Sequence, residues 1–153
     1  KSIYNIVLRA QLAAIEVVKP GNSLDDFHNK AVRVITESLV KLGFLSGEVD
    51  ELIKSEKYKK FYMHNTGHWL GLDSHDVGKR KIGEQARILE PGIVLTVEPG
   101  IYISKDTEGV PPEYWNIGVR IEDNVLVTED GNEVLTDKIP KTIEEIEHFM
   151  REG

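Results

Sequence analysis

The stretch GIVLTVEPG, residues 92–100, is where the sequence changes from a helical period to a strand period. It is rich in β-branched residues and is bounded by Pro-Gly on both sides, Pro91-Gly92 and Pro99-Gly100, which is typical of a short strand. Further along, GVRIEDNVLVTEDGNEVLT, residues 118–136, indicates two more strands and a turn at Glu129-Asp130-Gly131. We therefore expect the strands of the fold in the C-terminal part of the chain.

The N-terminal part of the chain predicts two amphipathic helices. Apolar residues recur at helical spacing over residues 3–18, and Lys-Pro-Gly at residues 19–21 ends the run. Ser23, followed three residues later by Asp26, predicts a capping box for a second helix, which Gly43 closes.

Two shorter helices are expected outside this pair. One is charged and covers residues 49–57, and the other begins at Thr142, with Glu145 completing a capping box. Helices first and antiparallel-looking strands afterwards predict an α+β layer architecture. No internal repeat, linker or low-complexity tract divides the 153 residues, so we expect one compact unit.

Composition and charge exclude several classes of protein. With 40% hydrophobic residues the chain can build a core, and a net charge of −7 argues against binding a phosphate backbone. No apolar run approaches the roughly 18 residues of a membrane helix, and no signal-peptide pattern is present. We therefore expect a soluble, cytoplasmic protein with no nucleic-acid or membrane partner. Because cysteine is absent, any metal must be held by histidine and carboxylate.

Three of the five histidines lie close together in MHNTGHWLGLDSHDVG, residues 63–78. On a helix, His64 and His68 would lie one turn apart and could share a metal ion. Gly67 and Gly71 argue against a helix, and in an extended segment the two rings would lie roughly 13 Å apart. At most one of the two is then a metal ligand, and the spacing does not tell which.

The alternative is a surface loop whose histidines, including His75, are solvated or hydrogen-bonded. Glycines between the histidines weaken this alternative, because they permit a close approach of the backbone. His28 and His148 occur singly on predicted helices, and for them we expect an ordinary structural role.

Two glutamates lie near the ends of predicted strands. Glu98 precedes Pro99, which favours an extended conformation, and Glu122 shares a strand face with Arg120. A carboxylate in such a place is costly to bury unless it is paired or binds a cation. A solvent-facing salt bridge from Glu122 to Arg120 or to a lysine is the ordinary explanation. Beside a His-rich loop, the glutamates also fit a divalent-metal site with nitrogen and oxygen ligands, and a possible hydrolytic metal site is as far as the residues alone lead.

Three segments taken together resemble one family. They are MHNTGHWLGLDSHDVG, LEPGIVLTVEPGIY and GVRIEDNVLVTEDGNEVLT. In this order and at these separations they are similar to the proline-specific metallopeptidases of the pita-bread fold, in particular the Xaa-Pro aminopeptidases. The resemblance runs from about Ile3 to Phe149. It implies the pita-bread form of an α+β fold, with helices packed on a curved antiparallel sheet.

The resemblance implies a set of metal ligands. In that family two divalent cations, typically manganese, are held by two aspartates, one histidine and two glutamates. Matched by position, His68, Glu98 and Glu122 are the implied ligands, with Glu122 bridging both ions. A hydroxide held between the ions is then implied to attack the scissile carbonyl.

The resemblance also implies residues that act on the substrate. His64 and His75 match two histidines that contact the substrate and stabilise the tetrahedral intermediate, and Arg120 matches a charged group that supports the bridging glutamate and the substrate. Asn65 and Gly67 stand where relatives commonly carry Gly and Ser, a change that leaves the ligand pattern intact.

Two of the family's ligands have no counterpart. The aspartates lie before the first helix, and this chain begins after them; Asp25 and Asp26 do not match. We therefore expect residues 1–153 to be the C-terminal part of a metallopeptidase catalytic domain. Such a chain is expected to hold at most one ion, weakly, and to be inactive by itself, whereas the full-length protein is expected to be a homo-oligomer.

The expected function of the parent protein is hydrolysis of the N-terminal Xaa-Pro bond of peptides with proline at the second position. The alternatives are an Xaa-Pro dipeptidase (prolidase) and a non-catalytic binding module of the same fold. The stretch EYWNIGVRIEDNVLV, residues 113–127, is more similar to the aminopeptidases. A further alternative is that a second copy or another segment supplies the missing sheet.

Overall fold

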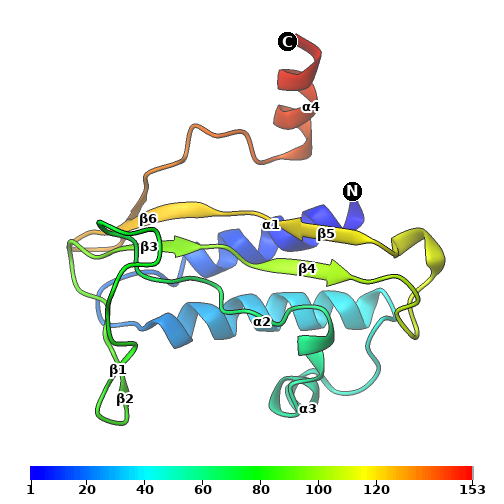
Figure 1. Cartoon of the computed structure of the whole chain (residues 1–153), viewed down its shortest axis with the longest axis horizontal. Coiled ribbons are helices and arrows are strands. Elements are labelled where there is room, and N and C mark those ends of the chain that lie inside the picture. Colours follow the sequence, from blue (N-terminus) through cyan, green and yellow to red (C-terminus); the bar gives the residue numbers. More distant parts are fainter. Residues whose placement is uncertain (153) are drawn as a thin grey trace.

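Two long helices lie against the strands in the computed structural model, which describes residues 1–152 (Figure 1). They are α1 (Ser2–Ile15) and α2 (Leu24–Lys41), and they pack against each other. Their apolar faces and those of the strands form one continuous core, in which Phe27, Ile35 and Leu95 have no solvent exposure. The α+β layer architecture expected from the sequence is therefore present.

The strands form three antiparallel groups. β3 (Val94–Val97) pairs with β6 (Asp123–Val127), which also pairs with β7 (Asn132–Val134). β4 (Gly100–Ile103) pairs with β5 (Ile117–Arg120), and β1 (Lys81–Ile82) forms a small hairpin with β2 (Gln85–Ala86). The remaining elements are α3 (Val49–Lys54), the 3₁₀ turns η1 (Lys57–Lys60) and η2 (Pro112–Tyr114), and α4 (Ile143–Glu152). Among residues 1–152, none of the helices combines the length and the apolar content that crossing a membrane requires.

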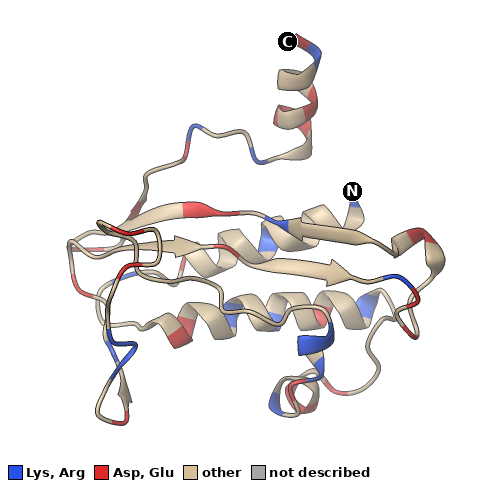
Figure 2. Ribbon diagram, in the orientation of Figure 1, with Lys and Arg blue, Asp and Glu red and all other residues tan. Residues whose placement is uncertain are grey.

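The backbone hydrogen-bond ladder is interrupted between two neighbouring segments of the chain, one running from β3 into β4 and the other from β5 into β6. The β3–β6 pairing ends at Asp123, and the β4–β5 pairing begins at Gly100. Between them lie Glu98–Pro99 on one strand and Ile121–Glu122 on the other, which together we call the ladder break. Proline has no N–H to donate, and the backbone contact across the break is a long one, from Ile121 N–H to the carbonyl oxygen of Pro99 (3.4 Å). In Figure 2, acidic ribbon marks both junctions, between β3 and β4 and between β5 and β6.

The helices are largely those predicted. In the capping box of α2, Ser23 N–H donates to Asp26 Oδ2 (2.7 Å) and Asp26 N–H to Ser23 Oγ (3.4 Å). Before α4, Thr142 and Glu145 cap each other in the same way, at 3.0 and 3.2 Å. The charged third helix is shorter than expected, because α3 ends at Lys54 and a separate turn, η1, follows.

The strand prediction needs one correction. GIVLTVEPG forms β3, as predicted, and the turn at residues 129–131 joins β6 to β7. However, residues 118–136 contribute to three strands rather than two, because the ladder break divides the first of the expected strands into β5 and β6. The sequence pattern did not predict β4, which is only four residues long and follows directly after a proline.

The His-rich segment is extended along the edge of β3. Glu98 N–H donates to the carbonyl oxygen of Thr66 (2.6 Å), and Thr96 N–H donates to that of His68 (3.0 Å). Gly67 lies between these two contacts, and a Cβ atom there would lie 1.9 Å from the carbonyl oxygen of Thr96. Only glycine fits at this point. The backbone hydrogen bonds to β3 confirm that the segment is extended and exclude a helix.

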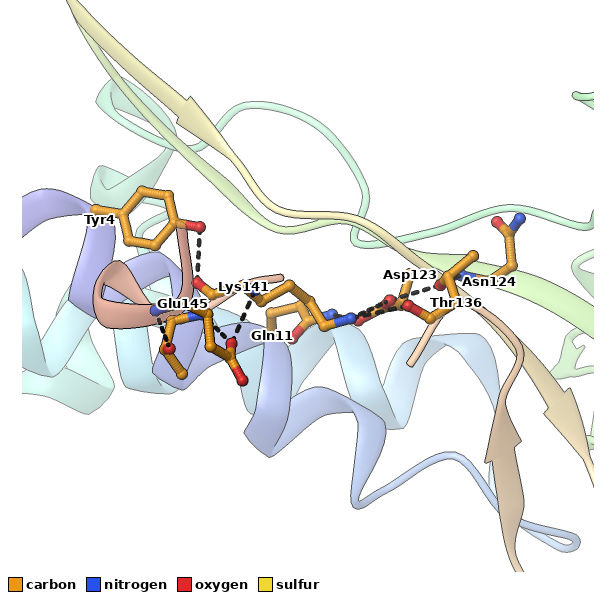
Figure 3. A network of polar contacts seen from close by, with 8 residues as sticks. Tyr4, Gln11, Asp123, Asn124, Thr136, Lys141 and Glu145 are labelled. Carbon is orange, nitrogen blue, oxygen red and sulfur yellow. Dashed lines mark hydrogen bonds and ion pairs between the residues drawn. The ribbon is translucent and has the colours of Figure 1, made fainter. Parts of the chain in front are cut away.

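A buried carboxylate holds the C-terminal segment against the body of the molecule (Figure 3). Asp123 is 1% exposed and accepts hydrogen bonds from Gln11 Nε2 (2.5 Å), Thr136 Oγ1 (2.5 Å) and Lys141 Nζ (2.9 Å). These three donors come from α1, from the residues after β7 and from the approach to α4. Beyond Lys141, α4 buries none of its residues and projects away from the sheet (Figure 1).

Candidate metal centre and active site

His68 and Glu98 face each other between the His-rich loop and the end of β3. His68 Nε2 lies 3.2 Å from Glu98 Oε1, and Glu98 is only 8% exposed. The other ring nitrogen, Nδ1, lies 2.9 Å from the carbonyl oxygen of Trp69, which can only accept, so Nδ1 carries the proton. In the neutral ring, Nε2 then presents a lone pair to a carboxylate oxygen. Two acceptors at this distance need a proton or a cation between them.

The pair has the chemistry and the spacing of two adjacent ligands of one divalent cation. An imidazole nitrogen and a carboxylate oxygen, each about 2.1 Å from an ion, lie about 3.0–3.4 Å apart at octahedral to tetrahedral bond angles. Metal-binding histidines usually donate their second N–H to a carbonyl or carboxylate, as His68 does. Within residues 1–152, however, no three His, Cys, Asp or Glu side chains converge on one point. The residues present therefore fit one edge of a cation site.

Hydrogen bonds and an ion pair hold Glu98 in place. Thr96 Oγ1 donates to Glu98 Oε1 (3.0 Å) and accepts from the backbone N–H of His68 (3.1 Å). On the other side of the carboxylate, Arg120 Nη1 lies 3.6 Å from Glu98 Oε2. Arg120 thus pairs with Glu98, and the salt bridge to Glu122 that the sequence suggested is not among the ion pairs of the described residues.

His64 belongs to a second hydrogen-bonded chain at the same site. Its Nδ1 donates to the carbonyl oxygen of Asn65 (2.8 Å), so its Nε2 accepts from the hydroxyl of Tyr102 (2.9 Å). That hydroxyl in turn accepts from Arg120 Nε (2.7 Å). Arg120 therefore connects the two parts of the site, because it touches Glu98 through one nitrogen and Tyr102 through another.

Tyr102 is the site residue that the sequence reasoning missed. With β4 recognised as a strand, alternation would have placed Glu98, Gly100 and Tyr102 on one face. Gly100 also gives the tyrosine room, since a Cβ atom there would lie 2.7 Å from the Tyr102 hydroxyl. The signal was therefore present as a Glu-x-Gly-x-Tyr spacing, but it depended on a strand that the pattern did not predict.

The two remaining candidate residues, His75 and Glu122, lie at the rim of the candidate site. The ring of His75 packs edge-on against that of His68, with centroids 4.3 Å apart, and it is exposed on the loop before β1. Glu122 is exposed at the ladder break, on the strand facing Glu98, and makes none of the polar contacts recorded for residues 1–152. The structure therefore gathers His64, His68, His75 and Glu98 with Arg120 and leaves Glu122 beside them.

The two lone histidines differ from each other. His148 is exposed on α4, where it lies 3.3 Å from Glu152 one turn away, as expected for an ordinary surface histidine. His28 is half-buried on α2 and hydrogen-bonds to Thr66 of the His-rich loop, and burial lowers its pKa to about 4.

Comparison with known proteins identifies the family. Residues 1–129 match the sequence profile described as Metallopeptidase family M24. The chain belongs to this family. A Xaa-Pro aminopeptidase of Haemophilus influenzae is 55% identical over 150 residues, which cover 98% of this M24 chain and 34% of that protein. The chain thus spans about a third of the length of the curated relatives that it matches.

Solved structures of M24 relatives confirm the fold. An aminopeptidase PepP of Pseudomonas aeruginosa is 54% identical with a TM-score of 0.97, and 99% of this chain matches 34% of that one. Aminopeptidase P of Escherichia coli, with the inhibitor Pro-Leu or in a zinc-substituted form with product, is 49% identical with a TM-score of 0.93, again over 99% and 34% of the two chains. These similarities confirm both the pita-bread fold and the resemblance to Xaa-Pro aminopeptidases.

Proposed function

We propose that residues 1–153 are the C-terminal part of the catalytic domain of a metal-dependent Xaa-Pro aminopeptidase. Its substrates are peptides with proline at the second position, from which it removes the first residue. The relatives that match nearly the whole chain carry this name, and one similar structure holds Pro-Leu, a dipeptide that begins with proline. The observation that carries the proposal is the His68–Glu98 pair, whose facing acceptor atoms have the spacing of two adjacent ligands of one cation.

The proposed metal ligands of this chain are His68, Glu98 and Glu122. In the complete protein two divalent ions, manganese by our proposal, share these ligands with aspartates from outside the chain. The absence of cysteine leaves only nitrogen and oxygen ligands, which suit manganese and do not exclude zinc. Bound divalent cations polarise the scissile carbonyl and lower the pKa of water.

The other residues of the chain position the peptide. Arg120 balances the charge of Glu98 and holds the Tyr102 hydroxyl, which fixes the His64 ring through its Nε2. His64 and His75 flank His68 on the same loop, where we propose that they contact the peptide on either side of the scissile bond. The half-buried rings of His64 and Tyr102 form an apolar wall that is suited to a proline ring.

Metal binding by this chain tests the ligand assignment. We expect Mn²⁺ titration to give at most about one weakly bound ion per chain, measured by elemental analysis and by broadening of the His68 ring signals. His68→Ala and Glu98→Gln are expected to weaken binding by more than the roughly 10- to 100-fold typical of changes to the partners of a ligand, because each changes a ligand itself. His148→Ala is the matched control, since His148 is exposed and far along the chain on α4. Binding that survives both ligand substitutions would contradict the assignment.

Peptide assays test the activity. We expect the 153-residue chain alone to be inactive and a longer protein that contains it to cleave Xaa-Pro-Xaa tripeptides. Cleavage of Xaa-Pro dipeptides only would favour the prolidase alternative. Binding of the peptide without cleavage by the metal-loaded longer protein would favour a non-catalytic binding module.

A further inference from the structure

A buried hydrogen-bonded cluster lies beneath the loop that carries His64 and His68. Thr66, between these two histidines, is fully buried, and His28 of α2 reaches it through Nδ1, which lies 2.8 Å from Thr66 Oγ1 and 3.3 Å from Thr66 N. Tyr62 is also fully buried, and its hydroxyl lies 2.5 Å from Thr66 Oγ1. His28 therefore connects the long helix α2 to the centre of the loop.

The donors and acceptors of this cluster fix one protonation pattern. A backbone N–H can only donate, so His28 Nδ1 must accept from Thr66, and the ring proton of His28 lies on Nε2. The Thr66 hydroxyl then donates to His28 Nδ1 and accepts from the Tyr62 hydroxyl. His28 thus takes the opposite tautomer to His64 and His68, whose Nδ1 atoms donate to carbonyl oxygens.

The cluster reaches the candidate metal pair through the backbone. The carbonyl oxygen of Thr66 accepts the backbone N–H of Glu98 at 2.6 Å. A cavity of about 590 Å³ is lined by His28, Tyr62 and His64, among others, and so borders the cluster. Thr66 itself is fully buried, so its polar groups depend on these contacts rather than on solvent, and the contacts hold the loop.

We propose that His28 is a positioning residue of the candidate active site: by accepting the hydrogen bonds of Thr66, it fixes the loop where His68 and Glu98 meet. The proposal rests on the proposed function in calling the site an active site, but the contacts by which His28 holds the loop do not depend on that function. Burial, reinforced by the positive charge of Arg80, keeps the pKa of His28 at about 4, which agrees with a neutral ring that accepts. None of the sequence motifs contains His28.

The tautomers provide the first test. In nitrogen NMR of the metal-free chain near neutral pH, we expect His28 to show a pyridine-like Nδ1 and a protonated Nε2. His64 and His68 are expected to show the reverse pattern, and exposed His148 a mixture. A protonated Nδ1 on His28 would overturn the proposal, because that nitrogen could not accept from Thr66.

Two variants test the positioning role. His28→Phe keeps a ring but offers no acceptor, whereas His28→Asn places an amide oxygen near the position of Nδ1. We expect amide hydrogen exchange at Glu98 to be faster by about tenfold in His28→Phe and close to wild type in His28→Asn. The amides of Ile35 in α2 and Val125 in β6 serve as internal references and are expected to keep their rates. A uniform acceleration at all three positions, or none at Glu98, would contradict the proposal.

A metal titration separates this proposal from the proposed function. If the wild-type chain binds Mn²⁺, we expect His28→Phe to weaken binding by about tenfold and His28→Asn to restore it. If the wild-type chain binds no Mn²⁺, the same titration is made on a longer protein that contains it, where absence of binding would contradict the metal assignment; the exchange rate of Glu98 in this chain still decides whether His28 holds the loop. Unaltered Mn²⁺ affinity in His28→Phe, with binding present in the wild type, would show that His28 does not position the pair.

Discussion

At residue 67 the loop and strand β3 touch backbone to backbone. A Cβ atom at Gly67 would lie 1.9 Å from the carbonyl oxygen of Thr96, and neither backbone can move without disturbing the His68–Glu98 pair. At Gly131, in the turn before β7, a Cβ atom would meet nothing within 4 Å. Glycine is therefore required by the lack of space at residue 67 but not at residue 131, and alanine substitutions at the two positions form a matched pair.

We expect Gly67→Ala to lower the free energy of unfolding by about 2–3 kcal/mol, because the added methyl group overpacks a rigid contact. Gly131→Ala is expected to have little effect, since its position is open. Urea denaturation followed by circular dichroism measures both. Equal stabilities for the two variants would show that the loop can move away from the strand at no cost.

His28 gives the free energy of unfolding a dependence on pH. Its pKa is about 4 in the folded chain, lowered first by burial and then by Arg80, with Lys59 and His64 adding smaller effects and Asp25 opposing them. The unfolded value is about 6.5, so between these values the unfolded state binds more protons and stability falls as the pH falls.

From pH 7.5 to pH 4.5 we expect wild type to lose about 2 kcal/mol through His28, after allowing for its partial exposure. His28→Asn cannot take up the proton and is expected to lose that much less over the same range. His148→Asn, at an exposed position, should follow the wild type. Parallel pH profiles for His28→Asn and the wild type would contradict the assignment of this loss to His28.

At the same scale, the sequence predicted most but not all of the residues that the structure brings together in the candidate site. His64, His68 and Glu98 stood out through their spacing and their match to a family, and the structure brings them together. Tyr102 and Thr66 did not stand out, because a tyrosine and a threonine are ordinary residues until their hydrogen-bond partners are known. Those partners come from segments far apart in the sequence, which spacing along the chain does not reveal.

At the scale of elements, the helices were easier to predict than the strands. Caps such as Ser23 with Asp26 are local, so three residues of sequence contain the whole signal. The division of one expected strand into β5 and β6 is not local, because it follows from Pro99 on the neighbouring strand. β4 was missed for a local reason and a remote one: it is four residues long and directly follows Pro99, and its partner β5 lies at residues 117–120.

The contact between Asp123 of β6 and Lys141 is the element-scale interaction that we expect to matter most for stability (Figure 3). Lys141→Met would leave a buried carboxylate with only Gln11 and Thr136 as donors. We expect a loss of about 3 kcal/mol, measured by urea denaturation, because removing one partner of a buried pair leaves the other charge uncompensated.

The control for that substitution is Lys1→Met. Lys1 pairs with Glu147, but both side chains are largely exposed, at 68% and 44%. Solvent screens such a pair, so the denaturation midpoint should not move. If Lys141→Met behaved like Lys1→Met, the Asp123 cluster would have to be satisfied by other groups once the lysine is gone.

At the scale of the whole molecule, the C-terminal segment consists of an anchor and a peripheral helix. α4 buries none of its residues, whereas Lys141, just before it, reaches the buried Asp123. Phe149 and Met150 on α4 are 70% and 76% exposed. The helix therefore adds little to the fold of this chain, and its exposed apolar residues make it prone to association.

Two truncations separate the anchor from the helix. A chain that ends at Thr142 keeps Lys141, and we expect its melting temperature to stay close to that of the full chain. A chain that ends at Pro140 loses Lys141 and, at about 3 kcal/mol, is expected to melt lower by roughly 6–12 °C, since the shift is about 2–4 °C per kcal/mol for this size. Differential scanning calorimetry measures both, and equal melting temperatures would place the stabilising contact elsewhere.

The ladder break has a consequence for how this sequence can vary. Glu98 and Glu122 lie at this break but differ in burial: Glu98 is buried and paired with Arg120, whereas Glu122 is exposed and makes none of the polar contacts of residues 1–152. A substitution of Glu98 is therefore expected to cost stability, and a substitution of Glu122 is expected to leave folding unchanged. A chain of this kind could change at Glu122 and keep the fold, and under the proposed function the same scaffold would then be available for recognition alone.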